Sequence, residues 1–160
     1  MILDGRQAIY FRAIGAGVVA AAAGGVAWAL IVKWSDYEIG VVAWAIGFLV
    51  SMAILLGAGQ RRGLPFQLVA IVLSLLGILL GKYLSYVWTL QDFVAEQTDG
   101  AVDIPLVSRD TFADFKDDLD FVFDWIDLLW AGLAIFTAWR TLAPRAPEPE
   151  PEPEPDPTPS

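Results

Sequence analysis

Residues 13–32 read AIGAGVVAAAAGGVAWALIV and contain no charged side chain. Residues 39–58 read IGVVAWAIGFLVSMAILLGA and are uncharged as well. Each run has about twenty residues, and a helix of that length crosses a hydrocarbon core of about 30 Å. Because lipid offers backbone groups no hydrogen-bond partner, such a run must satisfy its own hydrogen bonds. Both runs are therefore predicted to be transmembrane helices.

Two more spans are predicted further along the chain. The third covers residues 65–88, and Pro65 suits the first turn of a helix, where its missing N–H costs nothing. The fourth covers residues 121–139 and follows without a breaker from segment 110–120, whose apolar and acidic residues fall on opposite helix faces. The predicted fold class is all-α: a polytopic membrane protein with four transmembrane helices in an antiparallel bundle and an amphipathic interfacial helix before the fourth.

The remaining segments of the chain are polar. Residues 1–12 form a short lead, and because the apolar run after it is longer than a usual signal-peptide core, we expect that run to be retained. Residues 89–120 are predicted to form an acidic outer loop. Residues 144–160 alternate proline with Glu or Asp, which predicts an extended, disordered tail. The membrane domain then covers residues 13–143.

Lysine and arginine near the predicted span ends indicate the orientation. Arg61 and Arg62 lie in one short connection and Lys33 lies in the other, and cytoplasmic loops are the ones enriched in such cations. We therefore expect both termini in the cytoplasm and residues 89–120 on the outside. The predicted location is the cell membrane, specifically a bacterial inner membrane.

Composition narrows the possible chemistry. The chain has neither histidine, the commonest general base, nor cysteine, the source of thiol chemistry. Its net charge of -9 disfavours binding of nucleic acid, whose phosphates need basic partners. Neither a glycine-rich phosphate loop nor a calcium-loop pattern is present. We therefore predict no catalytic residue, no cofactor and no metal site, and we expect that the protein is not an enzyme.

Lys82 is the most informative single residue. It lies within the third predicted span, where a charge is costly and is usually paired. The candidate partners in a structural ion pair are Glu38, Asp124 and Asp127, which begin the second and fourth spans. Two alternatives stay open: Lys82 extends to the lipid headgroups without a partner, or it belongs to an ion pathway.

Small residues recur at every fourth position of the spans. Such rows let helix backbones approach closely, which drives helix association in lipid. The rows pack either within the four-helix bundle or between copies of the chain. The candidate helix-packing residues are Gly17, Ala21, Gly25, Gly47, Gly77 and Gly81.

A stripe of aspartates leads into the fourth span. Its members step by three or four residues and so stay on one side of a helix. The stripe is interpreted as a solvated helix face, with loose cation binding or docking of a basic partner as alternatives. The residues are Asp110, Asp114, Asp117, Asp120, Asp124 and Asp127.

Three short motifs carry a resemblance. They are Tyr37-Glu38-Ile39-Gly40, Gly81-Lys82-Tyr83-Leu84, and Ile126-Asp127-Leu128-Leu129-Trp130 continuing to Ala138-Trp139-Arg140. In this order they resemble a family of small bacterial multi-spanning membrane proteins with no assigned activity, over about residues 10–142. The resemblance implies a multi-spanning fold and assigns no functional residue.

The sequence favours one function class over another. A non-catalytic integral membrane protein that acts through protein or lipid interaction is the leading expectation. The alternative is a small homo-oligomeric channel or transporter assembled through the glycine rows. Against a pore, the first two spans offer no polar lining. The expected partners are the lipid bilayer and either another protein or further copies of the chain, and not nucleic acid.

Overall fold

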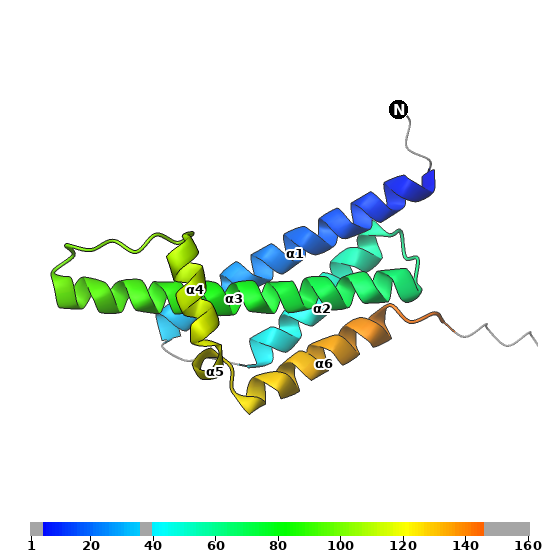
Figure 1. The fold of residues 1–160 in the computed structure, drawn as a ribbon. Coiled ribbons are helices and arrows are strands. Elements are labelled where there is room, and N and C mark those ends of the chain that lie inside the picture. The colour runs from blue at the N-terminus through cyan, green and yellow to red at the C-terminus, as the bar shows by residue number, and fades with distance from the viewer. Residues whose placement is uncertain (1–4, 36–39, 146–160) are drawn as a thin grey trace, which may run out of the picture.

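The computed structural model describes residues 5–35 and 40–145, and all of their regular secondary structure is helical, as predicted (Figure 1). No strand is present in these two segments. The helices are α1 (Gly5–Ser35), α2 (Val41–Gly57), α3 (Leu64–Thr98), α4 (Arg109–Asp117), α5 (Leu119–Val122) and α6 (Trp125–Thr141).

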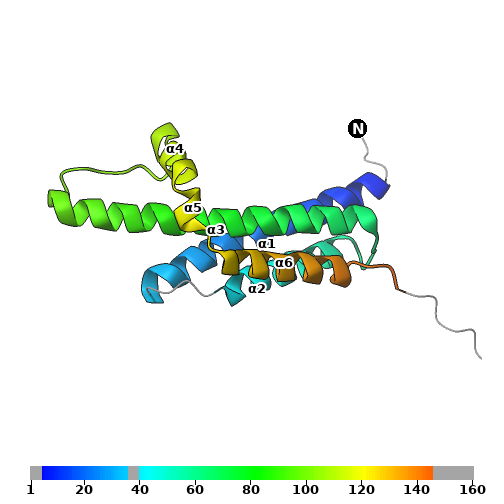
Figure 2. The same cartoon turned by 60° about the horizontal axis from the view of Figure 1, so that its bottom comes forward.

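Four of the helices pack side by side with alternating directions. Helices α1, α2, α3 and α6 form the bundle, in which α2 and α3 contact each other and each also contacts α1 and α6. Helices α1 and α6 lie on opposite sides of the α2–α3 pair (Figures 1 and 2). We call the end where α1 and α3 begin the basic end, and the end where α6 begins the cap end. Helices α4 and α5 lie at the cap end.

The bundle helices differ in length. Helix α1 has 31 residues and α3 has 35, and these two are long and apolar enough to cross a membrane. Helices α2 and α6 have 17 residues each, so by the same measure two helices qualify rather than the predicted four. At 1.5 Å per residue α3 is about 50 Å long, and its C-terminal part extends past the rest of the bundle.

Two predicted boundaries differ from the structure at the start of the long connection and at the start of the chain. The acidic loop predicted over 89–120 is helical up to Thr98, because no residue breaks the helix before Asp99 and Gly100, both of which have positive φ (49° and 77°). The polar lead predicted over 1–12 is helical from Gly5 onward and belongs to α1. Its first four residues, like most of the predicted tail, lie outside the described residues.

The continuous helix predicted across 110–139 is interrupted. Helix α4 ends at Asp117, α5 adds one turn, and α6 begins only at Trp125. The break occurs because Asp124 has an extended backbone (φ -100°, ψ 161°), and its carboxylate accepts a hydrogen bond from the Trp125 N–H at 2.6 Å. Asp124 and Asp127 together form a capping box, so the start of α6 is fixed by its own side chains.

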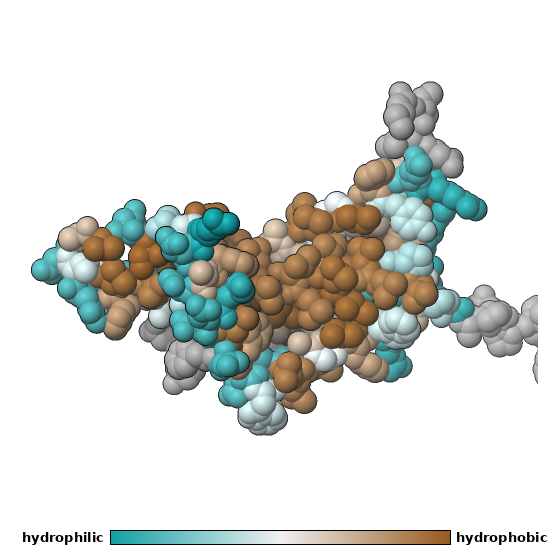
Figure 3. Space-filling view, in the orientation of Figure 1, coloured by the Kyte–Doolittle hydropathy of each residue, from teal (hydrophilic) through white to brown (hydrophobic). Residues whose placement is uncertain are grey.

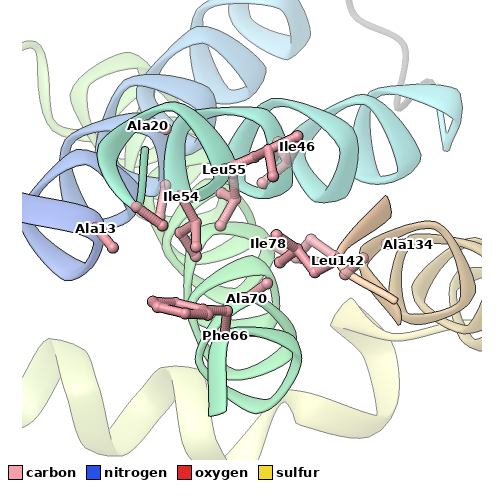
Figure 4. Packing of buried hydrophobic residues seen from close by; sticks show 14 of the residues in the cluster. Ala13, Ala20, Ile46, Ile54, Leu55, Phe66, Ala70, Ile78, Ala134 and Leu142 are labelled. Carbon is pink, nitrogen blue, oxygen red and sulfur yellow. The ribbon is translucent and has the colours of Figure 1, made fainter. Parts of the chain in front are cut away.

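Small and branched apolar side chains fill the space between the helices (Figure 4). Three buried serines satisfy their hydroxyl groups within their own helices, because each donates a hydrogen bond to the carbonyl four residues earlier. The bonds join Ser51 to Gly47, Ser74 to Ala70 and Ser85 to Gly81. The core includes Ala20, Ile46, Val50, Ile54, Leu55, Phe66, Ala70, Ile78, Ala134 and Leu142.

The candidate packing residues face one another across the bundle. A Cβ placed on Gly25 of α1 would lie 2.7 Å from the Gly77 carbonyl oxygen of α3. A Cβ on Gly81 would lie 3.2 Å from the Gly25 carbonyl, and one on Gly77 would lie 3.0 Å from the carbonyl of Ala21. These distances are too short for larger residues, so α1 and α3 cross with their backbones nearly in contact.

The two other candidate glycines lie at different contacts. A Cβ on Gly17 would lie 2.7 Å from Leu73 of α3, and one on Gly47 would lie 2.7 Å from Ala134 of α6. The structure thus places all the candidate glycines at contacts within the chain.

Large apolar side chains cover the face of the bundle seen in Figure 3, between its two polar ends, and exposed apolar residues occur on the other helix surfaces as well. We call this surface the apolar belt. It includes exposed residues of all four bundle helices: Val18 and Val19, Phe48 and Leu56, Val72 and Leu76, and Leu129 and Phe136.

Candidate functional site

The Lys82 side chain is enclosed at the cap end of the bundle. It projects from α3 and is 1% exposed, one of the largest fully buried side chains in the described part of the chain. Its ammonium lies 2.9 Å from the Asp127 carboxylate of α6 and 2.9 Å from the Val122 carbonyl oxygen at the end of α5. A single cation thus connects three helices that meet where the chain enters α6.

Two aromatic rings flank the Lys82 ammonium, and neither belongs to a residue predicted as part of a site. The ring of Trp28 in α1 is centred 5.9 Å from Nζ, and the ring of Phe123 is centred 5.4 Å away. Both distances allow cation–π attraction, which is strongest where water is excluded. Trp28 is 1% exposed, and its indole N–H has no acceptor within the described residues. The spacing of three residues from Gly25 was a sequence signal that Trp28 shares a helix face with that glycine, but no signal indicated its contact with Lys82.

The three acids predicted as partners of Lys82 have different placements. Asp127 makes the ion pair, and its Oδ2 also accepts the Asp124 backbone N–H at 2.9 Å. Asp124 serves as the cap of α6. Glu38 lies outside the described residues. Asp127 therefore combines two roles, since one carboxylate both pairs with Lys82 and fixes the first turn of α6.

Residues 99–124, which we call the cap, are held on α3 by further polar contacts. The Tyr83 hydroxyl donates to the Leu106 carbonyl at 2.8 Å, and the Gln91 amide donates to the Ile104 carbonyl at 2.6 Å. The Tyr86 hydroxyl donates to the Asp118 carboxylate at 2.6 Å. These bonds occupy successive turns of α3, so the cap is attached along a line rather than at one point.

Aromatic packing supports the same contact. Phe115 of α4 is 2% exposed, and its ring meets Tyr83 edge-on, with centroids 5.2 Å apart, and Tyr86 at 5.5 Å. Phe112, predicted on the same apolar face as Phe115, also contacts Tyr83, with the ring centroids 6.3 Å apart, although it is 54% exposed. Exposed aspartates occupy α4 and the turn after it, and we call them the acidic face. They are Asp110, Asp114, Asp117, Asp118 and Asp120, of which Asp118 also accepts the hydrogen bond from Tyr86 of α3.

A second ion pair at the cap end is open to solvent. Lys33 of α1 lies 3.5 Å from Asp92 of α3, and the two side chains are 42% and 64% exposed. Lys33 also lies over the ring of Trp88, 5.7 Å from its centroid. These side chains border a cavity of about 300 Å³ between α1 and α3. An exposed pair of this kind contributes about 0–1 kcal/mol.

The arrangement around Lys82 connects helices and offers little to a substrate. A side chain that is 1% exposed is closed to dissolved molecules, and its neighbours include two aromatic rings, a carbonyl and a carboxylate. Residues 5–35 and 40–145 contain no group of three or more acids placed to hold a metal ion. Comparisons of the chain with protein-family models, with curated proteins and with solved structures find no match.

Proposed function

We propose that this chain is a non-catalytic integral membrane protein that spans the bilayer four times and presents its cap to a protein partner. The observation that carries the proposal is the apolar belt, which runs over all four bundle helices and is bounded by charged residues at both ends (Figure 3). An exposed apolar surface of this extent is rare on a soluble monomer and marks contact with lipid or protein.

Helix lengths support four crossings. Helices α2 and α6, at 17 residues, are each about 26 Å long, close to a hydrocarbon core of about 30 Å. Helices α1 and α3 are longer and extend into the polar regions at their ends. Because Arg61 and Arg62 lie at the basic end, the positive-inside rule places that end and both termini in the cytoplasm. The proposed location is a bacterial inner membrane.

The cap supports interaction rather than chemistry. Its attachment along α3 holds the acidic face in one orientation, so a partner meets a surface that is already ordered. A dense negative face attracts a basic partner and excludes an acidic one. The partner expected is therefore a protein with a basic surface on the same side of the membrane as the cap.

The alternative is a homo-oligomeric channel. The candidate glycines fill contacts within the chain, which removes the interface first considered for such an assembly. Two other glycines in the bundle helices, Gly15 of α1 and Gly132 of α6, have nothing within 4 Å of a Cβ placed on them, so a helix of another copy could approach there. Conductance in liposomes that is lost with Gly132→Leu would favour the channel.

The experiment that tests the proposal is chemical crosslinking in cells, with two charge-matched triple variants. One variant neutralises the acidic face (Asp110→Asn, Asp114→Asn, Asp117→Asn), and the other removes three charges from the tail (Glu148→Gln, Glu150→Gln, Glu152→Gln). We expect one crosslinked partner, lost with the first variant and kept with the second. A partner that both variants retain, or crosslinks only between copies of the chain, would contradict the proposal.

The orientation has its own test. The chain has no cysteine, and Val107 in the cap is 90% exposed, so Val107→Cys introduces a single accessible thiol. A membrane-impermeant maleimide should label this thiol in intact spheroplasts. Labelling that requires permeabilised membranes would reverse the proposed orientation without affecting the argument from the apolar belt.

A further inference from the structure

Three arginines line one cavity at the basic end. Arg6 comes from the first turn of α1, while Arg61 and Arg62 come from the turn between α2 and α3. The cavity has a volume of about 430 Å³, and its remaining lining is Ile9, Tyr10 and Phe66. It thus combines guanidinium groups with an apolar wall.

The turn that carries two of these arginines is fixed on the bundle. Gly59 and Gln60 both have left-handed backbones, with φ of 63° and 65°, which reverses the chain directly after α2. The Arg62 guanidinium then donates to the Thr141 carbonyl at the end of α6. The Gly63 N–H donates to the Leu142 carbonyl at 3.0 Å, so the turn is attached to α6 at two adjacent positions.

The wall of the cavity is an aromatic stack. The rings of Tyr10 in α1 and Phe66 in α3 lie 5.1 Å apart, with 16° between their planes. Phe66 is 6% exposed and is anchored in the core, whereas Tyr10 is 41% exposed. The stack therefore gives the cavity a partly exposed aromatic side.

Within the described residues, the positive charge in the cavity has no matching anion. Arg6 and Arg61 are exposed, and neither has a carboxylate or hydrogen-bond partner for its side chain in the part of the chain that the structure describes. Arg62, which is half-buried, bonds to a neutral carbonyl. Three cations that gather without a counter-charge repel one another, and a bound anion would relieve that repulsion.

We propose that this cavity binds the phosphate group of an anionic phospholipid. Guanidinium groups recognise phosphate by paired, charge-assisted hydrogen bonds, and two segments of the chain supply them here. Basic pockets at the cytoplasmic ends of transmembrane helices are suited to such headgroups. Tyr10 and Ile9 would contact the glycerol and the first acyl carbons. The inference rests on the proposed function, since a lipid reaches the cavity from a surrounding bilayer. Free inorganic phosphate would meet the same guanidinium groups.

The test measures lipid selectivity of the full chain and of single-charge variants. The chain is placed in nanodiscs of phosphatidylcholine with a minor fraction of phosphatidylglycerol, and the lipid retained after extraction is identified by native mass spectrometry. Short-chain phosphatidylglycerol and inorganic phosphate are also titrated separately into the detergent-solubilised chain. The variants are Arg6→Gln and Arg61→Gln, and the control is Arg140→Gln, which removes an equal charge from an exposed residue outside the cavity.

We expect retention of phosphatidylglycerol over phosphatidylcholine. Arg6→Gln and Arg61→Gln should each weaken binding about tenfold, as expected for loss of one charge-assisted contact, while Arg140→Gln should change it less than about twofold. If short-chain phosphatidylglycerol binds and inorganic phosphate does not, the natural ligand of the cavity is a lipid headgroup. If inorganic phosphate binds and Arg61→Gln weakens its binding, the cavity recognises phosphate, but the ligand is a soluble phosphate.

Two results would overturn the inference. One is an equal loss of binding in Arg140→Gln and Arg61→Gln, which would indicate diffuse attraction to the whole basic end. The other is an absence of any preference for phosphatidylglycerol. Failure of the chain to enter nanodiscs would instead contradict the proposed function, and the detergent titrations would still report on the cavity.

Discussion

Removal of the charge on Asp127 should destabilise the bundle far more than removal of the charge on Asp124, three residues away. The Lys82–Asp127 pair has an N–O distance of 2.9 Å, with the side chains 1% and 14% exposed. At an effective dielectric constant of about 20, the gross attraction at this distance is about 6 kcal/mol. Desolvation of both charges offsets much of it, and loss of one partner from an enclosed pair typically costs about 3–5 kcal/mol.

The stability loss expected from each single substitution depends on what surrounds the charge that remains. Asp127→Asn leaves the enclosed Lys82 ammonium beside a neutral amide, and we expect the free energy of unfolding to fall by about 3 kcal/mol. Lys82→Met keeps the side-chain length and leaves a carboxylate that still accepts the Asp124 N–H, so a loss of about 2 kcal/mol is expected. The double variant should lose about 3 kcal/mol, which gives a coupling energy of about 2 kcal/mol.

The assay is unfolding of the purified chain from mild detergent micelles by titration with sodium dodecyl sulfate, followed by tryptophan fluorescence. Asp124→Asn is the matched control, because asparagine caps a helix as well as aspartate does. It should change stability by less than about 0.5 kcal/mol. A coupling energy below about 0.5 kcal/mol, or an equal loss in Asp124→Asn, would refute the role assigned to the Lys82–Asp127 pair.

Three further outcomes follow from the packing and the cap. Gly25→Ala should destabilise the bundle by about 1–3 kcal/mol, because the new Cβ would lie 2.7 Å from a backbone oxygen of α3. Gly15→Ala, whose Cβ would meet nothing within 4 Å, should be neutral or stabilise the bundle by up to about 1 kcal/mol. The same detergent titration measures both variants. Tyr86→Phe removes the hydrogen bond to Asp118 and should weaken cap attachment by about 1 kcal/mol, seen as faster amide hydrogen exchange in α4 with unchanged exchange in α2. Lys33→Met should cost less than about 1 kcal/mol, and its effect should disappear in high salt, because the pair it breaks is exposed; a larger, salt-independent loss would contradict this assignment.

Much of the bundle was predictable because apolar runs and short turns determine it. The segments predicted over 13–32 and 65–88 lie within α1 and α3, and the predicted contacts between consecutive spans are present. The extension of α3 to Thr98 was missed because acidic residues were interpreted as loop. Polarity does not end a helix, and the break came only where the backbone turns left-handed at Asp99 and Gly100.

The sequence narrowed the candidate partners of Lys82 to three acids but could not choose between Asp124 and Asp127. The choice depends on the residue at which α6 begins, and a shift of one residue rotates each side chain by about 100°. Asp124 and Asp127 have the spacing of a capping box, which was a usable signal for that start. Trp28 could not be assigned, because its contact with Lys82 depends on the crossing of α1 and α3 rather than on local pattern.

The two ends of the bundle use positive charge in opposite ways. At the cap end the cation is enclosed and contacts a carboxylate and a carbonyl, so its interactions are already made within the chain. At the basic end Arg6 and Arg61 are exposed and have no carboxylate partner in the described segments, so their interaction energy is still available to a ligand. Substitutions at Lys82 should therefore change unfolding with little change in lipid selectivity, and substitutions at Arg61 should do the reverse. A variant of either residue that changed both properties equally would mean that the two ends are coupled through the long helix α3.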